Sequence, residues 1–397
     1  MPPSTFPPNA SEPIVTSLST PRELAYSTAM IVLSTLGTGY FLGLFSPSIT
    51  AEFGTDQSTI GFIFALSTLA AVVPMFYLGG LVDRISLRSY TLILLAIFSV
   101  ASLCVAFAPN LLVFAIGILF VRLLGDWLFT HAALTASVRL LDGRKKALAG
   151  LPSLGYALGP SILPALAVLL LGIYGWRATW LGIALATAVV AIPAFLWLLA
   201  SECRTGIDAP AVARPRLAID HAVLPYLPAL MCVPLIFSGM LFHQSVWLDQ
   251  RGAADWIAIG LAAYAIAQTT AMLISGVLVD RFSARRVVAL YALPAALGMG
   301  VALVGSPDWT ILGYFVGAGF ATGLYFACTP HLLAELYGKA RLGSARAAVQ
   351  CVTLVCSAAS TIGLGVWTDA GLSISIVLVA GIVVIAVTSL IALLASH

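Results

Sequence analysis

Charged residues are scarce in this chain of 397 residues. Asp, Glu, Lys and Arg together make up 9% of the sequence, whereas hydrophobic residues make up 60% and the mean hydropathy is +1.04. A soluble domain of this size would need far more charge on its water-facing surface. The composition therefore excludes an ordinary soluble protein and indicates one that is largely embedded in a lipid bilayer.

Sequence patterns for metal binding and nucleotide hydrolysis are also missing. The six cysteines have no metal-type spacing and five of them lie in apolar stretches, so we expect no disulfide and no metal site. No Gly-x-x-x-x-Gly-Lys-Ser/Thr sequence occurs, and the short polar segments leave no space for a soluble catalytic or DNA-binding domain. We therefore expect no enzyme activity, no cofactor and no nucleic-acid partner.

The chain contains several long stretches without any charged residue. They include 28 residues between Glu23 and Glu52, 26 between Asp56 and Asp83, and 30 between Lys146 and Arg177. Because a spanning helix needs roughly 20 apolar residues, these stretches predict an all-α membrane protein with twelve transmembrane helices. The predicted spans are 25–48, 58–80, 90–108, 111–137, 148–172, 177–200, 223–248, 256–278, 287–305, 309–336, 344–367 and 372–394.

The distribution of basic residues predicts the orientation. With both termini in the cytoplasm, cytoplasmic segments hold 16 of the 19 Lys and Arg residues, and the external loops hold only Arg177 and Arg251. This is the asymmetry that the positive-inside rule requires. The short loops and the expected lack of disulfides favour the bacterial cytoplasmic (inner) membrane.

One signature occurs twice, as Gly79-Gly-Leu-Val-Asp83-Arg84 and as Gly276-Val-Leu-Val-Asp280-Arg281, and the two copies are 197 residues apart. A membrane protein built as a tandem repeat of this size is typical of a transporter. The polar stretch between the repeats predicts a linker. The predicted organisation is a disordered cytoplasmic tail (1–22), a six-helix bundle (23–200), a cytoplasmic linker (201–222) and a second six-helix bundle (223–397).

Twelve spans, a central linker and Gly-x-Leu-x-Asp-Arg after the second span resemble the major facilitator superfamily over residues 23–395. The resemblance implies alternating access between two halves. It also implies that Asp83 and Asp280 each meet the start of a helix in the opposite half, near Ser344–Arg346 and near Ala147 respectively. The gating residues implied in this way are Gly79, Asp83, Arg84, Arg88, Gly276, Asp280, Arg281 and Arg346.

Several segments resemble the bacterial branch of monocarboxylate and oxalate/formate porters, which implies a small carboxylate as solute. They are Gly43-Leu-Phe-Ser-Pro47, Gly175-Trp-Arg-Ala-Thr-Trp180, Ala334-Glu-Leu-Tyr-Gly338 and Leu342-Gly-Ser-Ala-Arg346. The stretches 256–278 and 347–367 nevertheless carry no charge, so the anion site of that branch cannot be transferred. Gly155-Tyr-Ala-Leu-Gly159-Pro160 resembles part of the antiporter motif of drug-efflux members, which leaves efflux of a toxic compound open.

Arg122 and Asp126 are the strongest candidates for chemistry. Arg122 lies near the middle of the predicted fourth span, where a charge is costly unless it has a partner or faces water. Asp126 is one helical turn further on, so the two side chains can meet. Arg122-Leu-Leu-Gly125 also resembles a motif of the superfamily in which the Arg takes part in proton coupling or substrate binding. The alternative is a permanent structural ion pair.

Five further polar or aromatic side chains are candidates for lining the solute path. Four of them fall near the predicted midplane, and they are Tyr40, Tyr156, Gln268 and Tyr325. Mostly apolar pockets with a few polar anchors are typical of small-molecule sites. His243, in the outer part of the seventh span, could act as a pH-sensitive gate residue. Each of them could equally serve only in helix packing.

The sequence therefore predicts a secondary transporter, acting as a monomer, that moves a small organic solute by alternating access. A proton or a counter-substrate is expected to be the second partner. The alternatives are an efflux antiporter and a transporter-like sensor. A sensor would need a larger cytoplasmic domain than the linker of about 22 residues provides. A membrane enzyme would need a cluster of His or acidic residues at one membrane face, which the sequence does not contain.

Overall fold

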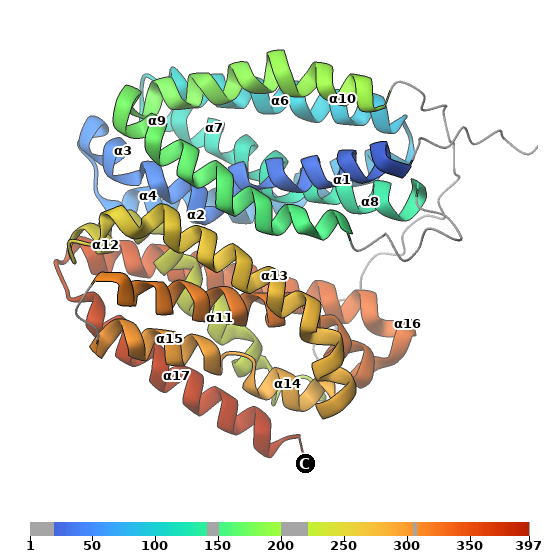
Figure 1. The fold of residues 1–397 in the computed structure, drawn as a ribbon, viewed down its shortest axis with the longest axis vertical. Helices are drawn as coiled ribbons and strands as arrows, with labels where there is room; N and C mark the ends of the chain where they lie inside the picture. The colour runs from blue at the N-terminus through green and yellow to red at the C-terminus, as the bar shows by residue number, and fades with distance from the viewer. Residues whose placement is uncertain (1–19, 141–150, 200–220, 305–307, 397) are drawn as a thin grey trace, which may run out of the picture.

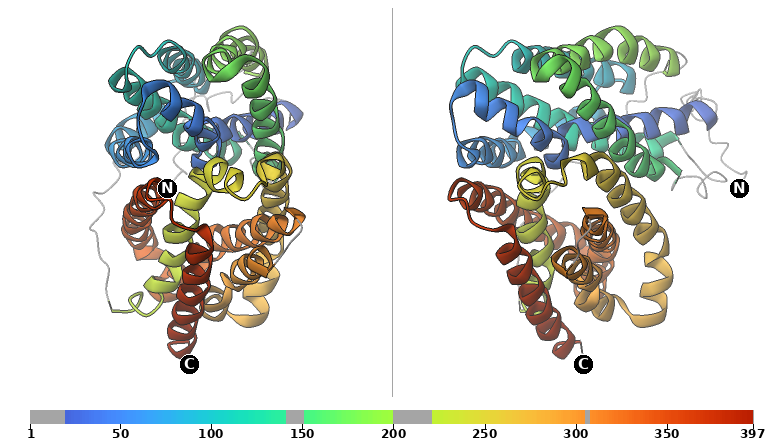
Figure 2. Two further views of the ribbon diagram at one scale, coloured as in Figure 1. Left: turned by 90° about the vertical axis from the view of Figure 1, so that its left-hand side faces the viewer. Right: turned by 60° about the vertical axis from the view of Figure 1, so that its left-hand side comes forward.

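The structure is a computed structural model, and it describes residues 20–140, 151–199, 221–304 and 308–396. The described part is helical throughout and contains no strand. Two bundles lie against each other, with the N-terminal half (blue to green) above the C-terminal half (yellow to red) in Figure 1. The two further views in Figure 2 show the same division.

The N-terminal half contains α1 to α10. Their bounds are α1 Thr20–Ser34, α2 Gly39–Leu42, α3 Ser46–Phe53, α4 Gln57–Ala70, α5 Val72–Gly79, α6 Leu87–Ala106, α7 Leu111–Arg122, α8 Thr130–Leu140, α9 Gly155–Ala186 and α10 Ile192–Leu198. The C-terminal half contains α11 Leu227–Phe242, α12 Gln244–Asp249, α13 Ile257–Phe282, α14 Ala284–Leu290, α15 Leu293–Val304, α16 Ile311–Asp369 and α17 Ile374–Leu394.

Within the described residues, nine helical segments are long and apolar enough to cross a membrane. They are Gln57–Met75, Leu87–Ala106, Leu111–Ser137, Leu151–Leu198, Ala254–Phe282, Ala284–Val304, Ile311–Gly338, Ala348–Asp369 and Ile374–Leu394. A bent pair, Pro21–Gly37 with Gly39–Phe53, would form a tenth span with a break of 52°. The all-α membrane fold is therefore confirmed, and the count of twelve spans stays a prediction.

Two of the long helices, α9 and α16, each contain a sharp bend at a glycine. α9 bends at Gly175 (φ 77°) and α16 bends at Gly338 (φ 64°), and both backbones are otherwise helical. Positive φ is readily available to glycine because it has no Cβ. The segment Leu151–Leu198 has 48 residues, more than twice what one crossing needs. Its bend lies between the predicted spans 148–172 and 177–200.

Arg177, just after the first of these bends, ties three elements together. Its Nε lies 2.7 Å from Oε1 of Glu52 in α3, and its Nη1 and Nη2 donate to the carbonyls of Ala106 and Ala108 at 2.8 Å. The guanidinium also stacks on Trp176, 4.4 Å from the ring centroid. Because charge-assisted hydrogen bonds are stronger than neutral ones, this one side chain anchors the ends of α3 and α6 to the turn of α9.

We predict that Arg177→Met destabilises the protein by about 1–3 kcal/mol, because two carbonyls and one oxygen of the Glu52 carboxylate lose their donor. The expected observation is a lower apparent unfolding temperature of the detergent-solubilised protein, measured by tryptophan fluorescence. Arg286→Met is the matched control, since Arg286 is an exposed arginine of α14. Equal unfolding temperatures for the two variants would contradict the anchoring role.

Candidate functional site

The Arg122–Asp126 pair is present at the end of α7. Arg122 is its last residue, and Asp126 lies in the π-helical segment Leu123–Phe129 that follows. Nη1 of Arg122 is 2.9 Å from Oδ2 of Asp126. The side chain of Arg122 is 7% exposed and that of Asp126 is 32% exposed. The carboxylate, not the guanidinium, therefore faces accessible space. Short π-helical segments are frequent at functional sites.

Arg122 makes two further hydrogen bonds, both within the N-terminal half. Its Nε donates to Oγ1 of Thr68 in α4 at 2.8 Å, and its Nη1 donates to the carbonyl of Gly37 at 2.8 Å. The ring of Phe64 covers the guanidinium, with 4.4 Å between the guanidinium carbon and the ring centroid. Partners of this kind offset the cost of burying a cation.

The carbonyl of Gly37 is available because the first span is broken. α1 ends before Gly37 and α2 begins after it, so the backbone there is not used by a continuous helix. Gly37 also packs directly on Gly125, and a Cβ on either residue would overlap the backbone of the other. The two glycines thus bring the break of the first span against the π-helical segment that carries Asp126.

Two of the predicted tyrosines lie close to Asp126. Tyr40 in α2 and Tyr156 in α9 are both within electrostatic range of its carboxylate. The ring of Tyr40 faces the ring of Tyr264 in α13, with 6.0 Å between centroids. Because α13 belongs to the C-terminal half, this group of residues lies where the halves meet. Tyr264 was not predicted, although it is one helical turn before the predicted Gln268.

Further contacts between the halves surround this group. The rings of Phe64 in α4 and Phe242 in α11 are 4.4 Å apart between centroids. Nε2 of Gln244 donates to the carbonyl of Tyr40 at 2.8 Å. The ring that covers Arg122 is therefore stacked on a residue of the opposite half. These three aromatic and amide residues were also missed by the sequence analysis.

Hydrogen bonds of the His243 and Tyr325 side chains stay inside the C-terminal half. His243 is fully buried, and its Nε2 lies 2.9 Å from the carbonyl of Thr361. The hydroxyl of Tyr325 is 2.8 Å from Oγ1 of Thr353. Gln268 is 8% exposed in α13. The structure thus brings Arg122, Asp126, Tyr40 and Tyr156 together. Gln268 and Tyr325 pack among the helices of the C-terminal half, and His243 also lies against Gly61 of α4 in the N-terminal half.

The predicted gating residues lie at the end of α5 and just after it, at the start of α6, near the end of α13, and in α16 beyond its bend. The exposed ones are Arg84, Arg88, Gly276, Asp280, Arg281 and Arg346. Gly79 is buried, and its carbonyl lies 3.1 Å from Nε2 of His131. The side chain of Asp83 and the segment around Ala147 lie outside the described residues, so the gating roles stay a prediction.

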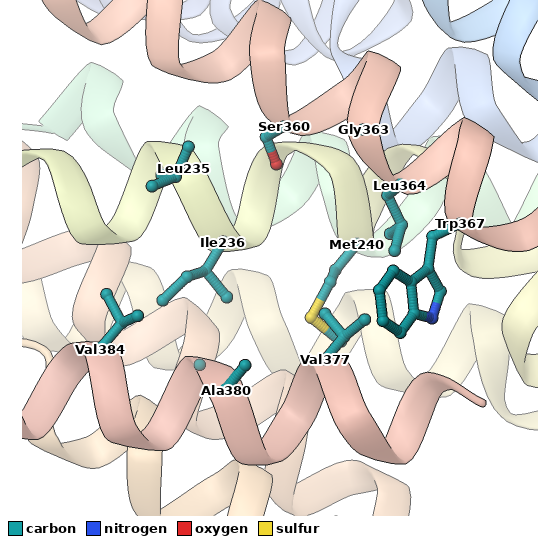
Figure 3. A pocket seen from close by; sticks show the side chains of 11 residues that line it. Leu235, Ile236, Met240, Ser360, Gly363, Leu364, Trp367, Val377, Ala380 and Val384 are labelled. Atoms are coloured by element: carbon teal, nitrogen blue, oxygen red, sulfur yellow. The ribbon is translucent and has the colours of Figure 1, made fainter. Parts of the chain in front are cut away.

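A groove of about 250 Å³ lies between α11, α16 and α17, and its lining residues do not include Arg122 or Asp126. Figure 3 shows the side chains that line it. Its lining is apolar except for Ser360 and Trp367. Oγ of Ser360 accepts the backbone N–H of Gly239 at 2.9 Å, and Nε1 of Trp367 donates to the carbonyl of Ser373 at 3.2 Å. With its polar groups satisfied internally, this groove offers nothing to bind a polar solute.

Comparison with known proteins agrees with the fold. No match was found among curated proteins. Among solved structures, a bacterial homologue of the human lysosomal transporter Spinster matches in its inward-facing, unoccupied form. The TM-score is 0.70 and the identity 15%, with 95% of this chain and 98% of that chain covered. The inward-facing, occupied form of that homologue gives a TM-score of 0.70, 14% identity and coverage of 95% and 97%.

The nucleoside transporter NupG gives a TM-score of 0.72 and 13% identity, with 93% of this chain and 98% of that chain covered. At these identities the structures show a shared fold. The family model of the Major Facilitator Superfamily matches residues 28–353, which is most of the chain. Family and fold together identify a transporter and not an enzyme, and the chain belongs to the major facilitator superfamily.

Proposed function

We propose that this protein moves a small organic solute across the membrane by alternating access of its two halves, with a proton carried by Asp126. The observation that carries the proposal is the position of Asp126. It is a half-buried carboxylate beside a buried Arg122, next to the tyrosines at the contact between the halves. An ionisable group inside a membrane bundle is costly, and such groups mark proton relays and solute paths.

The partners of Arg122 suggest how protonation acts. When Asp126 is ionised, it is held by Arg122; when it is protonated, the charge attraction to Arg122 is lost. Arg122 keeps its hydrogen bonds to Thr68 and Gly37, so the guanidinium stays in place while the carboxyl group is released. Released in this way, Asp126 is free to turn toward the space beside Tyr40. Protonation thus changes the group that faces the solute, at the segment where the first span contacts the opposite half.

The charges of the site favour a hydrogen-bond donor as solute over a carboxylate. Arg122 is the only Lys or Arg that the predicted topology places near the middle of a span. Three of its N–H groups bond Asp126, Thr68 and Gly37, and Phe64 covers its face. Because the Asp126 side chain is 32% exposed and that of Arg122 only 7%, a solute meets the carboxylate before the guanidinium. The accessible groups are a carboxylate and tyrosine rings, which suit a protonated amine or a neutral donor with an apolar body.

A small carboxylate remains the second candidate, because the sequence resembles the monocarboxylate and oxalate/formate branch. Its weakness is the lack of a free cation in the predicted eighth and eleventh spans. The two candidates also differ in the expected direction of transport. The branch resemblance favours uptake, and the partial antiporter motif favours efflux. A protonated solute exchanged for a proton at Asp126 would fit efflux across the inner membrane.

Asp126→Asn is predicted to abolish solute-driven proton movement, because the amide cannot bind and release a proton at neutral pH. The measurement is the internal pH of proteoliposomes that contain the purified protein, challenged with organic amines, neutral metabolites and organic acids. Asp255→Asn is the control, since it removes an exposed carboxylate in the short helical turn Ala254–Trp256 before α13. Solute-driven proton movement that is as large in Asp126→Asn as in the unmodified protein would reject the coupling role.

We predict further that solutes with the same aromatic body are discriminated by charge. Benzylamine, benzyl alcohol and benzoate differ chiefly in the charge and donor capacity of one group. Benzylamine and related protonated amines should compete for transport more strongly than their carboxylate analogues, on the order of tenfold. The reason is that the exposed polar group at the site, the Asp126 carboxylate, is a hydrogen-bond acceptor. The measurement is inhibition of the proton signal given by the best solute of the panel. Stronger competition by carboxylates would favour the monocarboxylate-like alternative.

A further inference from the structure

The start of α4 receives carboxylates from both halves of the protein. Oδ1 of Asp56, the residue before the helix, accepts the backbone N–H of Thr59 at 2.7 Å. Asp369, the last residue of α16, accepts the next two N–H groups toward the start of the helix. Its Oδ1 lies 2.9 Å from the nitrogen of Gln57 and its Oδ2 lies 2.7 Å from that of Ser58. Three successive N–H groups of one helix end are therefore satisfied by carboxylates.

The position of Asp369 is favourable only while α4 is in contact. The end of a helix carries a partial negative charge, so a carboxylate there is repelled by its own helix. The start of α4 carries a partial positive charge and free N–H groups, which bind an anion. Asp369 thus accepts two backbone N–H groups from the opposite half, whereas the end of its own helix repels its charge. Asp56, in contrast, is the residue just before α4, so it stays beside the helix when the two halves separate.

Glycines allow the two helices to approach at this end. Gly365 of α16 lies against the backbone of Gln57 and Ser58, and a Cβ on Gly365 would overlap Cα of Ser58. Gly61 of α4 lies against the carbonyl of Thr361 in the same way. The contact is therefore backbone against backbone, and the N–H groups of α4 lose access to Asp369 when the helices separate.

We propose that Asp369 is a gating residue that holds the two halves together on this side, which the predicted topology places outside the cell. Each opening of the solute path to the outside would withdraw the start of α4 from the Asp369 carboxylate, and each closing would restore both hydrogen bonds. This inference rests on the proposed alternating access. It assigns to the outer side a carboxylate latch of the kind that the family resemblance implies for Asp83 on the cytoplasmic side.

The test is a distance measurement that needs no solute. Spin labels on Ala51→Cys in α3 and Leu372→Cys after α16, both at exposed positions, report the separation of the halves on this side. The full chain is used in lipid nanodiscs, with its six native cysteines replaced. In Asp369→Asn one acceptor oxygen becomes an NH₂ group that faces an N–H donor, and the charge is lost. We expect the ratio of long to short distances to rise on the order of tenfold.

A second variant removes a donor instead of the acceptor. Gln57→Pro deletes one N–H at the first position of α4, where proline is favoured, and Asp56 already has the extended backbone required before proline. It should shift the distances in the same direction as Asp369→Asn. Asp56→Asn is the matched control, because it removes a carboxylate from the same helix end without crossing between the halves, and it should leave the distances unchanged.

Each outcome decides the proposal. An unchanged distance distribution in both Asp369→Asn and Gln57→Pro would overturn it, and so would an equal shift in Asp56→Asn, because that would indicate a simple loss of helix capping. The proposed transport is tested separately, by the proton signal in proteoliposomes. A latch that opens as expected in a protein without any solute-driven proton signal would leave the gating role intact and reject the coupled transport.

Discussion

Burying the guanidinium of Arg122 is the constraint around which the N-terminal half is built. A cation within a membrane bundle is costly unless it is paired, and three hydrogen-bond partners of Arg122 come from three elements: Thr68 from α4, Asp126 from the π-helical segment, and the carbonyl of Gly37. That carbonyl is free only because the first span is broken. The break then sets the position of α2 and of Tyr40, which contacts the opposite half.

The sequence predicts those parts of this arrangement that follow from the free-energy cost of placing charge in a bilayer. Charge is expensive in a bilayer, so charge-free stretches reveal the spans and a lone Arg122 with Asp126 one turn away reveals the ion pair. Tyr264 and Phe242 could not be found in this way. They are ordinary apolar-helix residues, and their importance comes from rings more than 170 positions away in the chain, at Tyr40 and Phe64.

Asp369 is a charged residue whose contact could not be predicted from the sequence either. In the sequence it is a solvent-facing carboxylate in a short loop, which carries no signal because such residues are common at span ends. Its significance appears only when Gln57 and Ser58, 311 or more positions earlier, are seen to donate to it. Pattern and hydropathy describe each helix alone, whereas the contact depends on how two halves meet. The Asp83 motif was visible as an internal repeat, but the partner expected for Asp83 came only from the family resemblance.

Taken with the family resemblance for Asp83, the Asp369 contact explains how one pair of helices can serve both sides of the membrane. Asp369 ends α16 and binds the start of α4; Asp83 follows α5 and would bind α16 just beyond its bend at Gly338. Each latch therefore joins the end of one span to the start of the other. Rigid helices that rock about a central contact cannot close both ends at once. In the proposed cycle the free energy of each latch would oppose that of the other, so a small change at Asp126 would decide which side opens.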